Sequence, residues 1–241
     1  MKSIERTFAC LQLFDEFERP AGMVEITRHL GYPASTVALI LKFLVAEGYL
    51  QHDRATRTYR PTVRLAQLGA WVGSRFAPDQ VLQDVTARVN KQTGEMVSIA
   101  ARNDIRAQYL FILGGRQKPL SVSAGSTRLL CRSGLGWALL SFLDRNALTS
   151  VVRRTNAMLP AEDRVDAVAM QGIADRCRED GYVFAEHTVR PGGGVIAVPV
   201  FTSRMQFAIG VHGQATRLRK SEQKIVALMK KELAAASPAF M

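Results

Sequence analysis

One stretch of this chain, residues 24–59, constrains the fold more than any other. Residues 24–30 form a short amphipathic run that ends at Gly31 and Pro33, and a longer run follows over residues 35–47. An arginine-rich turn and a second extended segment come next. Two helices joined by a glycine-containing turn and followed by a hairpin predict a winged helix-turn-helix.

The longer run has an apolar stripe at helical spacing. Val37, Leu41 and Leu44 recur with the period of a helix, with Ile40 beside them, so we expect these side chains to face the core. The side chains expected on the outer face are Ser35, Thr36, Ala38, Leu39 and Lys42. Small hydroxyl residues at the start of such a helix can approach phosphates and base edges.

The turn of the predicted hairpin is basic. Arg54, Arg57 and Arg60 lie within seven residues, as in a clamp for DNA phosphates. The alternative is a pair of ordinary packed helices with a solvated turn. We favour DNA binding, and the predicted DNA-binding side chains are Arg28, Ser35, Thr36, Leu39, Lys42, Arg54 and Arg57.

The net charge of +11 and the sequence pI near 10.1 also suggest nucleic acid, but the charge is unevenly placed. Residues 1–60 hold eight basic and seven acidic residues, so nearly all of the excess lies in residues 61–241. The excess is therefore equally compatible with a C-terminal half that prefers anionic ligands.

Composition places the chain among ordinary globular proteins. Its 241 residues, 47% of them apolar, can form one large or two modest domains. No apolar segment approaches the ~18 residues of a membrane span, and the N-terminus shows no secretory signal. Three scattered cysteines, Cys10, Cys131 and Cys177, fit a reducing compartment. We therefore expect a cytoplasmic protein without a membrane partner.

The remaining elements follow from periodicity. We expect one helix that begins at Ser3 as N-cap and is ended by residues 20–22, a second over residues 62–76, and a third from residue 81 to Gly94. The positions expected to face inward are Ile4, Phe8 and Leu11, with Phe14 or Phe17, in the first helix, Leu65 and Leu68 in the second, and Val81, Val85 and Val89 in the third. Pro78 ends the second helix, which we interpret as a linker with the domain boundary near Ala77.

Beyond Gly94 the period changes to two. We expect strands at residues 96–100, 109–113, 195–201 and 207–212, and helices at residues 135–143, 165–178 and 216–235. In the last helix Ile225, Leu233 and either Leu228 or Met229 should face inward. The order predicts an α+β domain on an antiparallel sheet. The predicted organisation is a winged helix-turn-helix domain over residues 1–61, a linker helix over 62–77 and the α+β domain over 78–241.

Several motifs recur in a fixed order along the chain. They occupy residues 3–8, 25–26, 30–31, 35–37, 47–50, 133–140, 180–182 with Glu186, and 191–201. In this order they resemble the signature of the IclR family of bacterial transcriptional regulators. The resemblance implies an N-terminal winged helix-turn-helix, a linker helix and a GAF-like effector-binding domain. It also implies a homodimer or homotetramer on a palindromic double-stranded DNA operator.

The resemblance also implies which residues bind an effector. The corresponding positions are Gly134 and Leu135 before the short helix, Glu186 in an acidic turn, Val195 on the next strand, and Gly210 and His212 on the last strand. Relatives often carry Cys or Ser where this chain has Val195, Gly210 and His212, which disfavours a glyoxylate- or pyruvate-like ligand. The room at Gly210 favours a bulkier small organic acid, such as an aromatic acid.

Three arginines lie beside these positions in the sequence. Arg128, Arg132 and Arg190 are either solvated surface residues or, in at least one case, the anchor of an acid effector, because a guanidinium pairs bidentately with a carboxylate. The outer face of the DNA-reading helix departs from the family at Ala38 and Leu39, where relatives carry polar residues. An exposed Leu39 could touch a thymine methyl group, and partial burial of Leu39 is the alternative.

The sequence predicts no catalytic, cofactor or metal site. His187, Cys131 and Cys177 lack zinc-type spacing and a nucleophile–base arrangement, and the glycines at 192–194 lack the lysine of a phosphate-binding loop. We therefore predict a ligand-responsive transcriptional regulator, not an enzyme. The alternatives are a small-molecule enzyme with an accessory helical domain, which would use Glu186, His187 and Cys131, and an oligomerisation protein that has lost operator recognition.

Overall fold

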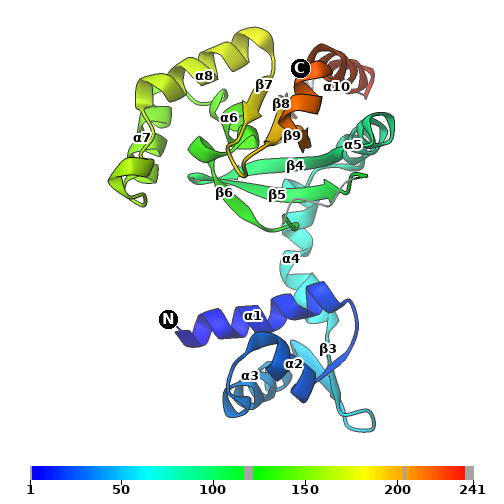
Figure 1. Cartoon of the computed structure of the whole chain (residues 1–241). Helices are drawn as coiled ribbons and strands as arrows, with labels where there is room; N and C mark the ends of the chain where they lie inside the picture. Colours follow the sequence, from blue (N-terminus) through cyan, green and yellow to red (C-terminus); the bar gives the residue numbers. More distant parts are fainter. Residues whose placement is uncertain (1, 117–121, 203–204, 237–241) are drawn as a thin grey trace. The chain divides into compact units, whose positions relative to one another are not determined.

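The computed structural model describes residues 2–116, 122–202 and 205–236 (Figure 1). The chain divides into two compact units, residues 1–75 and 76–241. None of the described helices combines the length and apolar character needed to cross a membrane.

The first unit is a winged helix-turn-helix. Its helices are α1 (Lys2–Phe17), α2 (Met23–Leu30), α3 (Ala34–Ala46) and most of α4 (Val63–Phe76). Its strands are β1 (Ala21–Gly22), β2 (Leu50–Asp53) and β3 (Thr58–Pro61), which form an antiparallel sheet in the order β1-β3-β2. Gly31, with a φ of 65°, ends α2 in the left-handed conformation and turns the chain toward α3.

The predicted core face of α3 is confirmed. Val37, Ile40, Leu41 and Leu44 are all buried, and they pack with Ile26 of α2 in the core of this unit.

The predicted inner face of α1 is wrong in its first half, at Ile4 and Phe8, and Phe14 is buried as expected. Ile4 and Phe8 are 65% and 60% exposed, whereas Leu13 and Phe14 are buried. Cys10 is also buried and precedes Leu13 and Phe14 by three and four residues, so the buried set has helical spacing as well, and only packing against α2 and α3 decides between the two sets. The helix already includes Lys2, so Ser3 lies inside its first turn and is not an N-cap. Leu68 of α4, expected to face inward, is 57% exposed.

The second unit is built on a six-stranded antiparallel sheet in the order β6-β5-β4-β9-β8-β7. The strands are β4 (Met96–Asn103), β5 (Arg106–Leu113), β6 (Thr127–Leu129), β7 (Val183–Glu186), β8 (Gly193–Phe201) and β9 (Gln206–Gln214). The predicted strands are confirmed, and each extends beyond its predicted range. Strands β6 and β7, at the two edges, were not predicted.

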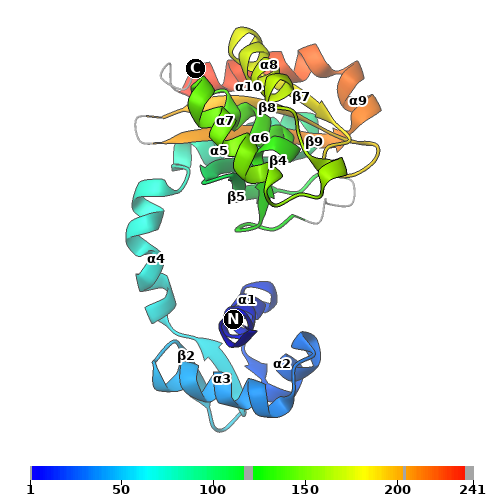
Figure 2. The ribbon, with the colours of Figure 1, turned by 90° about the vertical axis from the view of Figure 1, so that its left-hand side faces the viewer.

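Helices cover both faces of this sheet (Figure 1 and Figure 2). One face packs against α6 (Gly134–Leu140) and α8 (Ala167–Asp180), and α7 (Arg145–Asn156) packs against α8 in the same core. The other face packs against α5 (Gln80–Thr93), α9 (Ala215–Lys220) and α10 (Glu222–Ala236). Helix α7 was not predicted. The predicted final helix is two helices, because the chain breaks at Ser221 between α9 and α10.

The helix ends explain local details of this unit. Asp79 caps α5 by accepting a hydrogen bond from the Leu82 amide at 2.9 Å, and Gly94 ends the helix with a φ of 67°. Val85 and Val89 are buried as predicted, but Val81 is 44% exposed and Leu82 takes its place in the core. In α10 the predicted inward residues Ile225, Met229 and Leu233 are buried.

Candidate functional site

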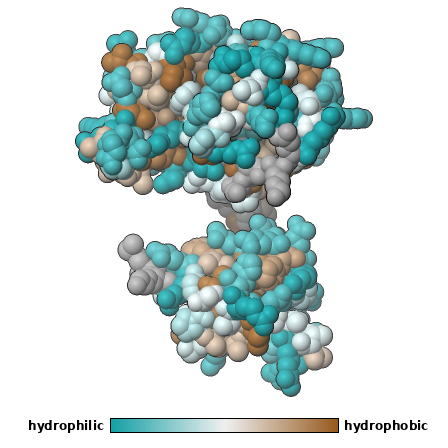
Figure 3. All heavy atoms as spheres, viewed as in Figure 1, coloured by the Kyte–Doolittle hydropathy of each residue, from teal (hydrophilic) through white to brown (hydrophobic). Residues whose placement is uncertain are grey.

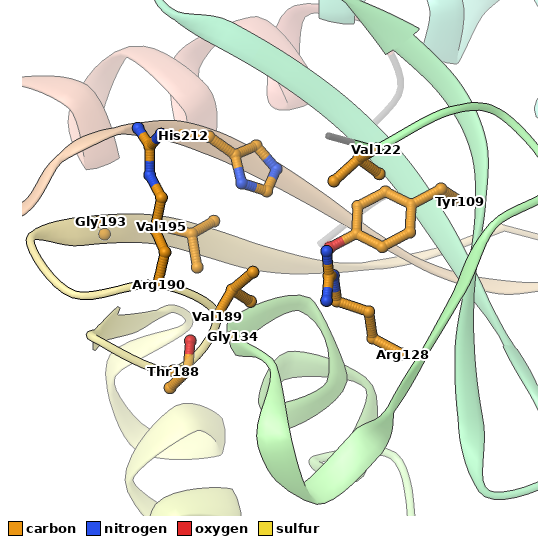
Figure 4. A pocket seen from close by; sticks show the side chains of 11 residues that line it. Tyr109, Val122, Arg128, Gly134, Thr188, Val189, Arg190, Gly193, Val195 and His212 are labelled. Atoms are coloured by element: carbon orange, nitrogen blue, oxygen red, sulfur yellow. The ribbon is translucent and has the colours of Figure 1, made fainter. Parts of the chain in front are cut away.

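A small cavity opens in the second unit beside the start of α6 (Figure 4). Its volume is about 20 Å³, which is room for roughly one water molecule. The lining residues come from strands β5, β6, β8 and β9, from α6, and from the segments before β6 and between β7 and β8: Tyr109, Val122, Arg128, Gly134, Thr188, Val189, Arg190, Gly193, Gly194, Val195 and His212.

Three of the six predicted effector residues line this cavity. Gly134, Val195 and His212 do so, whereas Leu135 and Gly210 do not. A Cβ atom added at Gly210 would lie 2.9 Å from Cγ2 of Val195 and 3.1 Å from Cγ of Leu135. The space in front of Gly210 is therefore filled by the protein's own side chains, and the inference of extra ligand room at this glycine was wrong.

Glu186 is held away from the cavity by an ion pair. It is the last residue of β7 and lies in a strand, not in a turn as expected. Its carboxylate accepts two hydrogen bonds from the Arg219 guanidinium, one of them with an N–O distance of 3.3 Å. The same arginine lowers the pKa of Glu186. This carboxylate is committed to Arg219.

Two of the three candidate arginines line the cavity. Arg128 lies on β6 and Arg190 follows β7, whereas Arg132 pairs with Asp163 at 3.0 Å and does not line it. The described lining residues thus carry two guanidinium groups and no carboxylate. Such a lining favours an anionic ligand.

Tyr109 lies next to Arg128 in the cavity wall. Its hydroxyl points at the Arg128 guanidinium (Figure 4). Burial raises the pKa of Tyr109, and the positive charge of Arg128 opposes that shift. The phenol is therefore neutral near neutral pH and adds a polar hydroxyl to the cavity wall.

His212 is a neutral polar group in the cavity wall. Its Nε2 lies 2.7 Å from the Ser98 hydroxyl, and both side chains are buried. Burial, aided by the charge of Arg128, lowers the pKa of His212 to about 3. The imidazole is therefore uncharged near neutral pH, and Nδ1 is the ring nitrogen that remains for a ligand.

The segment that joins β7 to β8 borders the cavity and forms a tight turn. The His187 amide donates to the Gly193 carbonyl at 2.8 Å, and the Gly192 amide donates to Nδ1 of His187 at 2.9 Å. The Ala215 amide, at the start of α9, donates to the Gly192 carbonyl at 2.9 Å. His187 thus holds the turn together, and Val189 and Arg190 are exposed on it.

The three cysteines are buried and free. Burial raises the pKa of each thiol, to about 11 for Cys10. A thiol is a poor nucleophile and metal ligand in this state.

The predicted DNA-binding residues lie in α2, α3 and the hairpin of the first unit. Arg28, Ser35, Leu39, Lys42, Arg54 and Arg57 are exposed, and Thr36 is half-buried. Leu39 is 69% exposed, so the alternative of partial burial is wrong. The Asp53 carboxylate fixes the hairpin turn by accepting from the Ala55 and Thr56 amides at 2.8 and 3.3 Å.

Sequence reasoning missed several residues at these sites. Phe43 of α3 lies one turn after Leu39 and is 54% exposed. Its position could have been predicted, because it lies outside the apolar stripe of the helix. Tyr109 and Ser98 could have been found from strand alternation. Val122, Thr188 and Val189 gave no signal, because they lie outside the regular elements.

Two family models match the chain. The model described as bacterial transcriptional regulator IclR C-terminal covers residues 79–238, and the IclR helix-turn-helix domain covers residues 3–54. The HTH-type transcriptional regulator XynR of Escherichia coli K12 is 22% identical over 227 residues, which are 92% of this chain and 90% of that protein.

Solved structures share the fold. The IclR of Thermotoga maritima superposes with a TM-score of 0.73 at 17% identity, covering 98% of this chain and 97% of that chain. An IclR homologue from Microbacterium hydrocarbonoxydans in complex with 4-hydroxybenzoate superposes with a TM-score of 0.64 at 17% identity, covering 97% and 99%. At these identities the likeness shows the fold alone.

Both matched families are domains of transcriptional regulators, and XynR is itself named a transcriptional regulator. The alternative of an enzyme with an accessory helical domain is therefore rejected. The helix-turn-helix match covers α1, α2, α3 and strands β1 and β2 of the first unit, and the C-terminal match covers the sheet of the second unit. The chain belongs to the IclR family and is a DNA-binding transcriptional regulator.

Proposed function

We propose that a small organic acid binds in the cavity of the second unit and modulates operator binding by the first. One observation carries this proposal: Arg128 and Arg190 both line the cavity, and its described lining holds no carboxylate. A guanidinium matches a carboxylate with two parallel hydrogen bonds, and such bonds are strongest where water is excluded. Neutral His212 adds a hydrogen-bonding group without changing the charge.

An aromatic acid suits the remaining lining. Tyr109, Val122, Val189 and Val195 provide apolar and aromatic wall. The homologue from Microbacterium hydrocarbonoxydans, of the same fold, is in complex with an aromatic acid, 4-hydroxybenzoate. This supports the proposal without identifying the ligand of this chain.

Binding of an aromatic acid requires the cavity to widen. A cavity that takes benzene is roughly 150 Å³, against about 20 Å³ here. Val189 and Arg190 are exposed, so outward movement of their segment breaks little packing. The proposed site consists of Gly134, Val195 and His212, with Arg128 and Arg190 as anchors. Of the other predicted residues, Leu135 and Gly210 pack beside Val195, and Glu186 holds Arg219.

The effector acts on DNA binding only through unequal affinity for two states of the protein. We propose that residues 62–77 link the DNA-binding and effector domains of a cytoplasmic homodimer or homotetramer. Two winged domains of such an assembly would occupy two half-sites of a palindromic operator. The predicted DNA contacts are Arg28, Ser35, Thr36, Leu39, Lys42, Arg54 and Arg57.

The experiment is a thermal-shift comparison of matched ligand pairs on the full chain. Benzoate and 4-hydroxybenzoate are compared with benzamide and 4-hydroxybenzamide, which keep the ring and lose the charge, and pyruvate tests a small acid. A ligand at 100 times its Kd stabilises by about 2.7 kcal/mol, which raises Tm by several degrees. We expect the carboxylates to stabilise the protein and the amides not to do so. Equal shifts with both members of each pair, or none with any, would contradict the acid proposal and leave DNA binding untouched.

A further inference from the structure

The exposed face of α3 carries two large apolar side chains. Leu39 and Phe43 are 69% and 54% exposed, are one helical turn apart, and lie on the side of α3 away from its buried stripe. Apolar atoms also reach the surface of the first unit in the space-filling view (Figure 3). Two large apolar side chains exposed side by side on a helix mark a contact site, so this part of α3 is built to be covered.

The chemistry of α3 limits what can cover it. Lys42 is the one charged residue among its 13 residues, and Ser35 and Thr36 are its only hydroxyl-bearing ones. The helix carries no Arg, Asn, Gln, Asp or Glu. It therefore lacks the side chains that hydrogen-bond bidentately to guanine and adenine or accept from cytosine in the major groove.

The major groove offers one apolar group to such a helix, the C5-methyl of thymine. We propose that Leu39 and Phe43 read thymine methyl groups, so that each operator half-site is specified by thymines at the positions these two side chains reach. This inference rests on the DNA-binding function of the family and on α3 as the helix that enters the groove.

The surroundings of this face fit DNA better than a second protein surface. Lys42 lies between Leu39 and Phe43 in the sequence and is exposed. Strand β2 packs against α3 and leads into the turn that presents Arg54 and Arg57. Positive side chains around an apolar strip suit phosphates flanking thymine methyls, whereas a contact between two copies would bring these like charges together.

The test replaces thymine by deoxyuridine, which removes the methyl group and nothing else. Two random duplex pools of the same design, one made with dT and one with dU, are selected on the full-length protein. The site recovered from the dT pool is then resynthesised with dU at each thymine in turn. We expect thymines at fixed positions of each half-site, and a loss of roughly four-fold in affinity for each contacted methyl.

Two variants assign the methyls to side chains. Each of Leu39→Ala and Phe43→Ala should still bind the site. At the position that the missing side chain reads, each variant should bind DNA with dT and DNA with dU equally well. Leu68→Ala, an exposed leucine of α4, serves as control and should keep the full dT/dU difference.

Other outcomes overturn the inference in distinguishable ways. Equal affinity for dT and dU at every position shows that DNA is bound and that methyl groups are not read. If no sequence is enriched from either pool, α3 does not recognise a DNA sequence, and the inference is contradicted. Loss of oligomers in Leu39→Ala and Phe43→Ala by sedimentation, with an unchanged dT/dU ratio, assigns this face to a contact between copies.

Discussion

The Ser98 hydroxyl lies 2.7 Å from Nε2 of His212, across the boundary between β4 and β9. In the register of these strands Ser98 faces Gly210 and Met96 faces His212, so Ser98 and His212 are diagonal neighbours on one face of the sheet. The serine therefore fixes the imidazole ring and leaves Nδ1 as the nitrogen available to a ligand.

Buried His212 should make the protein less stable at acidic pH. Its pKa is near 6.5 in the unfolded chain and about 3 in the folded one. Between these values the unfolded chain binds a proton that the folded chain does not, so the free energy of unfolding falls as pH falls from 6.5 toward 3. The loss is at most about 2 kcal/mol between pH 6.5 and 5.

Equilibrium urea unfolding of the wild type and of His212→Asn at pH 7 and pH 5 measures this effect. The variant should lose less stability than the wild type on acidification. Leu135→Ala removes a buried side chain in the same region and should lower stability by a similar amount at both pH values. A wild-type loss no larger than that of His212→Asn would show that the histidine titrates without cost to the fold.

The second prediction compares the effects of Arg128, Arg190 and Arg132 on the affinity for an acid effector. Arg128→Gln should weaken binding of the aromatic acid roughly 10- to 100-fold, because Arg128 is half-buried and the variant removes a charge-assisted pair. Arg190→Gln should cause a smaller loss, because Arg190 is exposed and water screens its charge. Arg132→Gln removes an arginine that pairs with Asp163 outside the cavity and should leave affinity unchanged. Titration calorimetry provides the measurement, and an equal loss in all three variants would indicate a general effect of charge.

The third prediction concerns the close approach of α6 to the sheet. A Cβ at Gly134 would overlap Cγ1 of Val195 and lie 2.8 Å from Cβ of Ala185. Gly134→Ala should therefore destabilise the protein by about 1–3 kcal/mol. Val195→Ala in the same chain should restore part of the loss, because the main obstacle is a side chain.

Gly136→Ala is the matched comparison. A Cβ there would overlap the backbone of Leu130, which cannot move aside. Val195→Ala should bring no recovery in that background. Chemical denaturation of the four variants tests both statements, and equal rescue of both glycine variants would contradict them.

The fourth prediction concerns phosphate contacts in the first unit. Lys42→Ala and Arg57→Gly should each weaken DNA binding and reduce the salt slope by about one unit. Glycine is chosen because Arg57 has a φ of 54°, which glycine adopts without strain. Arg88→Ala, in the second unit and paired with Glu232, should leave the slope unchanged. Unchanged salt slopes in all three variants would show that Lys42 and Arg57 do not contact phosphates.

The sequence predicted the elements whose periodicity is strong. In α3 the buried stripe recurs without ambiguity, so both the helix and its orientation were predicted correctly. In α1 two stripes share the same spacing, and tertiary packing selects Leu13 and Phe14 over Ile4 and Phe8. Strands β6 and β7 are short edge strands with three and four residues, too few for alternation to be recognised.

Helix α7 was missed although its signals are present. Asp144 accepts from the Ala147 amide as an N-cap, and Leu148, Val151, Val152 and Thr155 follow at core spacing. The cavity was harder, because its lining depends on which strands are neighbours. Arg128 and Arg190 were named from chain proximity alone, and nothing in the sequence showed that Leu135 and Val195 fill the space before Gly210.

A cavity that holds about one water also bears on the concentration at which the regulator would respond. If the effector enters only after the segment of Val189 and Arg190 swings out, the apparent Kd equals the intrinsic Kd divided by the fraction of molecules already open. Substitutions that loosen this segment would then shift the response threshold to lower effector concentrations and leave the ranking of ligands intact. Sensitivity and selectivity would thus be adjustable at different residues.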